Sequence, residues 1–313
     1  MRLTRRGFIG GAAGLIMASV LPGKAGAVEG RAGGTGSGGR ITAIDTHAHV
    51  FRRGLKLADV RRYAPDYDAT PEDYLRQLDL NGISHGVLIQ PSFLGTDNSY
   101  VLEALRKYPV RLRGVAVVQP NIAKTALVDM DREGIVGIRL NLMGLPVPDF
   151  RSDPWPSLLR TVVDLGWHVE LHRHAADLAK IVDVLLKSGV NIVLDHFGLP
   201  DQKLGVNDPG FRSLLASAES SRRVWLKLSG LYRNGAAGVG EKNTMGAIPL
   251  LRQSFGVDRL VWGSDWPHTA FEKVMEYSKA RAHLDMWLPD KEERKTVLVD
   301  TPARLFRFCG KRG

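Results

Sequence analysis

The stretch "ITAIDTHAHVF", residues 41–51, decides between the two folds that an alternating α/β sequence allows. An open, doubly wound sheet normally carries a glycine-rich dinucleotide loop directly after its first strand. Here the first apolar run is instead followed by His47 and His49, in a segment without glycine. Side chains at positions i and i+2 of a strand point to the same face, so both imidazoles can meet one ion or one substrate. The stretch therefore favours a barrel with polar side chains at the end of its first strand.

Short apolar runs typical of β-strands alternate with helical patterns from residue 41 onward, and eight of each can be counted. One helix is expected at residues 70–82, because Thr70 can cap it and Pro71 suits its first position. Eight such units match a (β/α)8 TIM barrel, which typically has about 250 residues. The expected strands are residues 41–45, 86–90, 114–118, 136–142, 168–172, 191–196, 224–229 and 259–265, and further expected helices are 175–189, 210–220 and 271–284. Residues 292–308 are predicted to form a closing helical extension.

The first 27 residues have the pattern of an export signal, with a basic start, a short apolar stretch and small residues at positions 25–27. Arg5 and Arg6 resemble the twin-arginine signal of bacterial proteins that are exported already folded. A general secretory signal or a membrane anchor is the alternative, but the apolar stretch is shorter than the roughly 20 residues that span a bilayer. We expect residues 1–27 to direct the chain to the Tat export machinery, and the mature protein to be periplasmic or exported without stable membrane insertion.

The glycine-rich residues 28–40 have no apolar periodicity and are predicted to be a linker, so the folded domain is expected at residues 41–313. The net charge of +10 includes four basic residues of the predicted signal, and no run of Lys or Arg exceeds a pair. This argues against a nucleic-acid partner and suits an anionic small-molecule substrate. The single cysteine, Cys309, excludes an internal disulfide.

Polar residues gather at the predicted C-terminal ends of the strands. In a parallel barrel these ends meet on one face, where active sites lie. A single histidine there is more often an ordinary hydrogen-bonding group, but six of the nine histidines stand at such ends and Asp265 stands at the eighth. The residues at these ends are His47, His49, Arg139, Asn141, His172, His174, Asp195, His196, Lys227, Ser229, Arg233, Asp265 and His268. We interpret His85, His168 and His283, which lie elsewhere, as structural or surface residues.

Three imidazoles and one carboxylate suit a catalytic zinc or similar divalent ion, which keeps one position open for water. The predicted ligands are His47, His49, His172 and Asp265. His172 is preferred because it lies closer to its strand, although the i, i+2 spacing leaves His174 as a rival. His196 is then free to act on the substrate or to support the ligands.

Six segments together resemble a known family. They are "IDTHAHVF" (44–51), "YDATPEDYLRQLDLNGISHGVLIQPSFLGTDNSYVLEAL" (67–105), "GIRLN" (137–141), "VLDHFGLP" (193–200), "LKLSG" (226–230) and "GSDWPH" (263–268). Their combination is similar to the amidohydrolase-related (amidohydrolase 2) family of TIM-barrel metal-dependent hydrolases, in the branch that holds 2-pyrone-4,6-dicarboxylate lactonase, 4-sulfomuconolactone hydrolase and sugar lactonases. The resemblance covers residues 41–308.

The resemblance implies roles for individual positions. The family's first-strand histidines fall on His47 and His49, its sixth-strand histidine on His196 and its eighth-strand aspartate on Asp265. In the pyrone lactonase, which works without a metal, the position of His172 is a tyrosine, whereas related mononuclear decarboxylases have a metal-binding histidine there. The resemblance therefore implies a metal-bound enzyme, with metal-free catalysis as the alternative.

The resemblance also bears on the substrate. Arg139 and Arg233 match arginines that hold substrate carboxylates in the pyrone lactonase, but a further arginine of that clamp is absent from residues 141–149. We therefore expect a lactone or similar cyclic ester of an anionic or sugar acid, with the missing arginine arguing against the pyrone dicarboxylate itself.

The expected reaction is hydrolysis by a metal-activated water. Asp265 is expected to take the proton of this water and return it to the leaving alkoxide, while His196 donates a hydrogen bond to the carbonyl oxygen. A metal-dependent decarboxylase of the same superfamily is one alternative. A non-catalytic exported binding protein is the other, and the presence of Asp265 argues against it.

Overall fold

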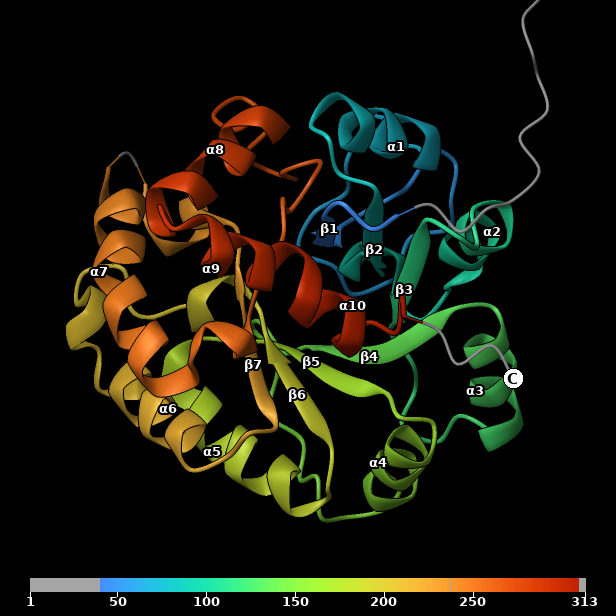
Figure 1. Ribbon diagram of the computed structural model, residues 1–313. Helices are drawn as coiled ribbons and strands as arrows, with labels where there is room; N and C mark the ends of the chain where they lie inside the picture. Colours follow the sequence, from blue (N-terminus) through green and yellow to red (C-terminus); the bar gives the residue numbers. More distant parts are fainter. Residues whose placement is uncertain (1–39, 237, 310–313) are drawn as a thin grey trace, which may run out of the picture. The chain divides into compact units, whose positions relative to one another are not determined.

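The computed structural model describes residues 40–236 and 238–309, which form eight strands and ten α-helices (Figure 1). The strands are β1 (Ile44–Ala48), β2 (His85–Ile89), β3 (Leu112–Ala116), β4 (Ile135–Asn141), β5 (His168–His172), β6 (Asn191–Leu194), β7 (Val224–Leu228) and β8 (Leu260–Trp262). The helices are α1 (Pro71–Leu80), α2 (Ser99–Lys107), α3 (Lys124–Arg132), α4 (Trp155–Asp164), α5 (Ala175–Lys187), α6 (Pro209–Glu219), α7 (Val239–Phe255), α8 (Tyr277–Trp287), α9 (Lys291–Lys295) and α10 (Thr301–Leu305). The predicted signal peptide and all of the predicted linker except Arg40 lie outside the described residues. None of the described helices has the length and apolar character needed to cross a bilayer.

The strands form one parallel sheet that closes on itself. Each strand from β1 to β8 pairs in parallel with the next one along the chain. The closure is made just beyond β8, where Asp265 N donates to His47 O at 2.8 Å and His49 N donates to Trp266 O at 2.8 Å. The predicted (β/α)8 TIM barrel is therefore confirmed, with the helices surrounding the sheet (Figure 1).

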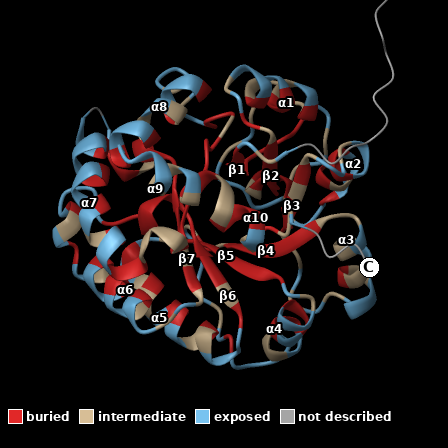
Figure 2. Ribbon diagram, viewed as in Figure 1, coloured by how far each residue is buried: buried red, intermediate tan, exposed pale blue. Residues whose placement is uncertain are grey.

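The outer helices α1 to α8 bury residues on the side that faces the barrel. In α5 the buried side chains Leu178, Ile181, Val182 and Leu185 recur at the spacing of one helical face. Figure 2 shows the same division around the ring, with buried residues on the strands and exposed residues on the outer helix surfaces. The predicted start of α1 is confirmed, because the Thr70 side chain accepts a hydrogen bond from the first turn in a capping box.

The C-terminal segment closes the end of the barrel where the strands begin. Helices α9 and α10 are joined by one π-helical turn, Thr296–Asp300, and α10 crosses this end of the barrel in Figure 1. Ala303 and Phe306 pack with the inward apolar side chains Ile44, Val87, Ile89, Val115, Val136 and Val261. The predicted closing extension is confirmed. Because this end is filled, the opposite end of the barrel is the place for a site.

Several predicted boundaries are wrong: β3 ends at Ala116 rather than at residue 118, and β8 ends at Trp262 rather than at residue 265. Two larger differences have a visible cause. Strand β1 runs from Ile44 to Ala48 rather than over residues 41–45, because Thr42 N binds the Ser84 side chain instead of a backbone partner. The helix predicted at residues 271–284 begins only at Tyr277. The residues before it form turns that bring the ring of Phe271 to 4.6 Å from the ring of Tyr232, beside the site.

Candidate active site

His47, His49 and Asp265 each direct one donor atom to a common point at the C-terminal end of the barrel. His47 lies in β1, His49 follows that strand, and Asp265 follows β8. The two histidine Nε2 atoms are 3.3 Å apart, and Asp265 Oδ1 lies 3.7 Å from each of them. The three side chains are buried. A zinc ion with tetrahedral bonds of about 2.0–2.1 Å has its ligand atoms about 3.3 Å apart, so this spacing fits such an ion.

Hydrogen bonds to other residues leave two of these atoms as free acceptors. His49 Nδ1 lies 2.8 Å from Ile89 O, and because a carbonyl can only accept, the hydrogen is on Nδ1 and Nε2 keeps its lone pair. Asp265 Oδ2 accepts from Tyr232 OH at 2.8 Å and from Arg233 Nε at 2.6 Å. Asp265 Oδ1 is buried and has no hydrogen-bond partner among the described residues. It is thus free to face the histidines.

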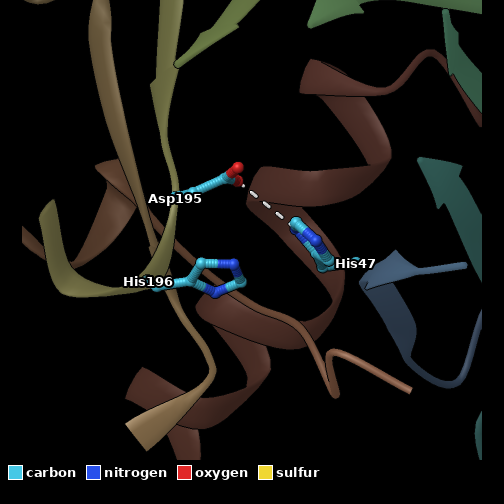
Figure 3. Close-up of side chains that lie close together, drawn as sticks. All are labelled: His47, Asp195 and His196. Atoms are coloured by element: carbon cyan, nitrogen blue, oxygen red, sulfur yellow. Dashed lines mark ion pairs between the residues drawn. The ribbon is translucent and has the colours of Figure 1, made fainter. Parts of the chain in front are cut away.

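His47 supplies the third acceptor. Its Nδ1 is 3.3 Å from Asp195 Oδ1 and 3.1 Å from Lys227 Nζ (Figure 3 shows the pair with Asp195). Lys227 has acceptors of its own, Glu170 Oε2 and, at 3.5 Å, Asp195 Oδ1. With the Nδ1 hydrogen of His47 directed to Asp195 instead of Nδ1 accepting from Lys227, Nε2 keeps a lone pair, and this is the form that can bind an ion. In this form three buried acceptors face each other, and two imidazoles with one carboxylate suit a divalent ion between them.

Asp45 in β1 joins this strand to the loop that carries Asp265. Asp45 Oδ1 accepts from His47 N at 3.1 Å and from Ser264 N at 2.9 Å. Asp45 Oδ2 accepts from Ser264 Oγ at 2.6 Å and from Tyr277 OH at 3.0 Å. Asp265 itself has a φ of 60°, a left-handed conformation that costs an aspartate about 1–3 kcal/mol and is common at functional sites. The surrounding hydrogen bonds hold it there.

A buried ionic layer of Arg139, Glu170, Asp195 and Lys227 lies directly beneath the site. Arg139 donates to Asp195 Oδ2 from Nη2 at 2.8 Å and from Nε at 3.1 Å. Arg139 Nε also lies 3.3 Å from Glu170 Oε1, and Lys227 Nζ contacts Glu170 Oε2. Although burial acts to raise it, the pKa of the Asp195 carboxyl lies well below its usual value because of Arg139, His47 and Lys227. Two cations and two carboxyl groups therefore lie together under the ligands, where burial and the neighbouring Asp195 charge raise the pKa of Glu170 to about 8.

His172, the predicted ligand on β5, lies beside Arg139 and His196 and outside the group of three donor atoms. Its Nδ1 accepts from Arg139 Nη2, which is 3.2 Å away. Among the described residues, two sets bring one donor atom per residue within 4.8 Å of each other: His47, His49 and Asp265, and His47, Asp195 and His196. Neither set contains His172. The rival His174 is exposed at the start of α5.

His196 follows β6 and lies against both neighbouring imidazoles. The centres of its ring and the His47 ring are 4.8 Å apart, and those of its ring and the His172 ring are 5.1 Å apart. Its Nδ1 is 2.9 Å from Ser229 Oγ. A Cβ on Gly230 would lie 2.8 Å from this nitrogen, so only glycine leaves room for the imidazole.

The site histidines are neutral at physiological pH. Burial lowers the pKa of His49 to about 3 and that of His196 to about 4, and burial also places the pKa of His47 and of His172 well below the usual value. Although burial acts to raise it, the pKa of the Asp265 carboxyl lies well below its usual value because of the Arg233 charge beside it. Neutral imidazoles and an ionised carboxylate are the forms that bind a metal ion.

Comparison with known proteins gives the family. The sequence profile of the family described as Amidohydrolase matches residues 44–308. The chain belongs to the amidohydrolase family. It is 30% identical over 274 residues to the 2-pyrone-4,6-dicarboxylate hydrolase of Comamonas testosteroni, covering 84% of this chain and 90% of that protein.

Two further relatives of this amidohydrolase are similar over most of their length. The 4-sulfomuconolactone hydrolase of Hydrogenophaga intermedia is 29% identical over 274 residues, covering 84% of this chain and 88% of that protein. A crystal structure from Acinetobacter baumannii, described as a "probable 2-pyrone-4,6-dicarboxylic acid hydrolase" with citric acid bound, is 39% identical. It superposes with a TM-score of 0.83 and covers 85% of this chain and 100% of that one.

Both predicted substrate arginines of the amidohydrolase lie at the site, and both pair with carboxylates of the protein. Arg139 is 3% exposed and is bound to Asp195. Arg233 donates from Nε to Asp265, while its side chain stays 18% exposed. The two Nη atoms of Arg233 make no hydrogen bond within the part of the chain that the structure describes. Arg233 can therefore bind a ligand without leaving Asp265.

Two residues of this amidohydrolase site are absent from the predicted set. Glu170 stands between His168 and His172 in "HVELH". A carboxylate at an inward-facing position of a strand is unusual, and this feature could have marked Glu170 as a site residue. Tyr232, which holds Asp265 Oδ2, lies in the short helical turn Leu231–Asn234 after β7. No sequence pattern marks it.

Proposed function

We propose that this amidohydrolase opens a lactone or similar cyclic ester of an anionic or sugar acid by hydrolysis. The observation that carries the proposal is the set of three facing acceptor atoms on His47, His49 and Asp265. The relatives named above are hydrolases of a pyrone dicarboxylate and of a sulfomuconolactone, which supports a negatively charged cyclic ester as the substrate class.

We propose further that His47, His49 and Asp265 hold a divalent ion, with zinc the best match to two imidazole nitrogens and one carboxylate oxygen. Such an ion, when bound, polarises an ester carbonyl and lowers the pKa of a water molecule to about 7. His172, the fourth predicted ligand, accepts from Arg139 at Nδ1, so the hydrogen of its neutral ring is on Nε2. It can join the ion only if Arg139 turns away, and otherwise its Nε2 donates a hydrogen bond to the substrate. In the metal-free alternative, the same histidines bind the substrate directly.

Asp265 transfers the proton of the reaction, and His196 stabilises the negative charge that develops on the carbonyl oxygen. Asp265 Oδ1 takes a proton from the water whose oxygen bonds to the carbonyl carbon. When the ring C–O bond breaks, Asp265 returns this proton to the alkoxide oxygen, and the product is a hydroxy acid. The Ser229 hydroxyl, by donating to His196 Nδ1, makes Nε2 the protonated nitrogen, which donates a hydrogen bond to the carbonyl oxygen as negative charge develops there.

Arg233 and Arg139 bind the anionic part of the substrate in this proposal. The Nη atoms of Arg233 are available for a carboxylate, for which the guanidinium fork is well shaped. Arg139 contributes through Nη1, since its Nε and Nη2 are held by Asp195 and His172.

Export in the folded state is a separate proposal, which rests on Arg5 and Arg6 of the predicted signal. Folding before export would let the protein acquire its ion in the cytoplasm. Cell fractionation that finds a shortened chain in the periplasm supports the proposal, and a full-length cytoplasmic chain contradicts it.

The reaction class is tested with a panel of carboxylated and sugar lactones, with ring opening followed by proton release. We expect turnover of at least one lactone with one acid group formed per ring opened. Carbon dioxide release from an aromatic acid, without lactone opening, would instead assign a decarboxylase. If neither chemistry occurs in the presence of Zn²⁺, Mn²⁺ or Co²⁺, the protein is a binding protein and the proposal is wrong.

A further inference from the structure

The loop between β1 and α1 is a packed lid beside the site. Phe51 and Ala69 form an antiparallel bridge at its base, and Ala58 N donates to Phe93 O at 2.8 Å. The ring of Tyr63 packs against the ring of Phe93 with centres 5.4 Å apart. The loop carries five basic residues: Arg52, Arg53, Lys56, Arg61 and Arg62. Because the loop is anchored at several points, these charges have defined positions.

Arg62 is the basic residue of the loop that reaches the mouth of the barrel. Its Nη2 donates to Asn141 Oδ1 at 3.4 Å, and Asn141 is the last residue of β4, two positions after Arg139. Arg53, by contrast, is paired with Asp68 at 3.2 Å. Within residues 40–236 and 238–309, no carboxylate lies within 4.0 Å of a nitrogen of Arg62. Arg62 therefore presents an unpaired positive charge at the open end of the site.

At the mouth of the barrel, the positive charge of Arg62 is not balanced by a carboxylate of the described residues. Arg139 and Arg233 are each neutralised by a carboxylate, Asp195 and Asp265. The pKa of Arg62 is lowered from its usual value by partial burial of the guanidinium and by the positive charges of Arg139 and Arg233. Arg62 reaches the end of β4 through Asn141, two positions after Arg139, so an anion at this end of the barrel would remove the imbalance.

We propose that Arg62 binds a carboxylate that the substrate carries outside its lactone ring, and that it thereby selects carboxylated lactones over neutral sugar lactones. The inference rests on the proposed function and narrows its substrate class. In this arrangement Arg233 and Arg62 approach the anionic end of the substrate from different loops, after β7 and β1, while the ring carbonyl lies at His196 and Asp265. A planar guanidinium that already has one fixed hydrogen bond, to Asn141, is well placed to receive a carboxylate.

The first test is binding of tricarballylate, which has the three carboxylates of citrate but lacks the hydroxyl that strengthens metal chelation. Calorimetry of the whole protein compares wild type with Arg62→Ala, and with Arg61→Ala as the matched control. Arg61 is in the same loop but donates to the loop's own Ala58 O at 2.8 Å. We expect the Kd to rise about tenfold or more in Arg62→Ala and less than about twofold in Arg61→Ala. Equal binding by wild type and Arg62→Ala, or no binding by wild type, overturns the proposal.

The second test asks whether Arg62 selects carboxylated substrates or only stabilises the loop. Arg62→Ala should raise KM for muconolactone, which carries a carboxylate, by about tenfold while changing kcat little, and should leave KM for neutral glucono-1,5-lactone unchanged. Arg62→Lys keeps the charge and should retain most of the affinity for muconolactone. An equal loss with both lactones would show a structural role and overturn the inference. If wild type opens no lactone, the proposed function fails, whereas the tricarballylate result still decides whether Arg62 binds carboxylates.

Discussion

Replacing Asp265 with asparagine is expected to lower kcat for lactone hydrolysis by about a thousandfold or more while leaving the fold intact. The amide cannot take a proton from water, and loss of a positioned general base alone costs about 10²–10⁴-fold. The amide oxygen can still accept from Tyr232 and Arg233, which turns the amide nitrogen toward the two Nε2 atoms of His47 and His49. There it donates to the lone pairs that would otherwise bind the ion.

The Asp265→Asn variant should therefore lose the bound metal together with turnover. The measurements are steady-state kinetics, metal content and the urea midpoint of unfolding. Asp149→Asn is the matched control, because Asp149 is an exposed aspartate in the loop after β4 whose side chain, among the described residues, bonds only to Arg151 and Ser152. A kcat for Asp265→Asn within tenfold of wild type would remove Asp265 from the mechanism.

Replacing Lys227 with methionine is expected to lower the free energy of unfolding by about 3–5 kcal/mol. Lys227 is fully buried and contacts Glu170 while lying 3.5 Å from Asp195. Methionine fills much of the same volume but leaves two buried carboxylates with only Arg139 to balance them. Urea unfolding followed by circular dichroism measures the change.

The control is Lys107→Met, which breaks a surface ion pair with Glu72 and should leave the free energy of unfolding nearly unchanged. Adding Glu170→Gln to Lys227→Met should recover part of the lost stability, because the unpaired buried charge is then removed. An unfolding midpoint of Lys227→Met equal to that of wild type would show that the buried ionic layer does not stabilise the barrel.

The position of the site could be predicted from sequence because a parallel barrel brings its strand ends together. His47, His49, His196 and Asp265 follow from that rule alone, since each stands at the end of an apolar run. The orientation of their donor atoms does not follow from it. His49 is turned by the carbonyl of Ile89 in β2, which is distant in the sequence and carries no side-chain signal.

The same limit applies to the arginines and to His172. Arg139 stands at the predicted strand end, but whether it meets a substrate or a protein carboxylate depends on Glu170 in β5 and on Asp195 directly after β6. The orientation of the His172 ring in turn depends on the hydrogen bond that its Nδ1 accepts from Arg139 Nη2. These pairings are tertiary contacts between inward-facing side chains, and the period of the strand shows only that such residues face inward.

The loop before α8 shows how a helical pattern can be overridden. Residues 271–284 have helical spacing, yet Phe271 packs on Tyr232 and the backbone turns until Tyr277, whose hydroxyl donates to Asp45. Contacts to the site thus set the start of α8, and local propensity does not.

Lactone turnover after removal of metal tests the central claim most directly. The protein is prepared without a histidine tag, treated with chelator, and assayed while its residual metal content is measured. If His47, His49 and Asp265 hold a catalytic ion, activity should fall in proportion to metal content and return with one equivalent of Zn²⁺ per chain. Full-rate hydrolysis by metal-free protein would contradict the account and would mean that the two histidines bind the substrate directly.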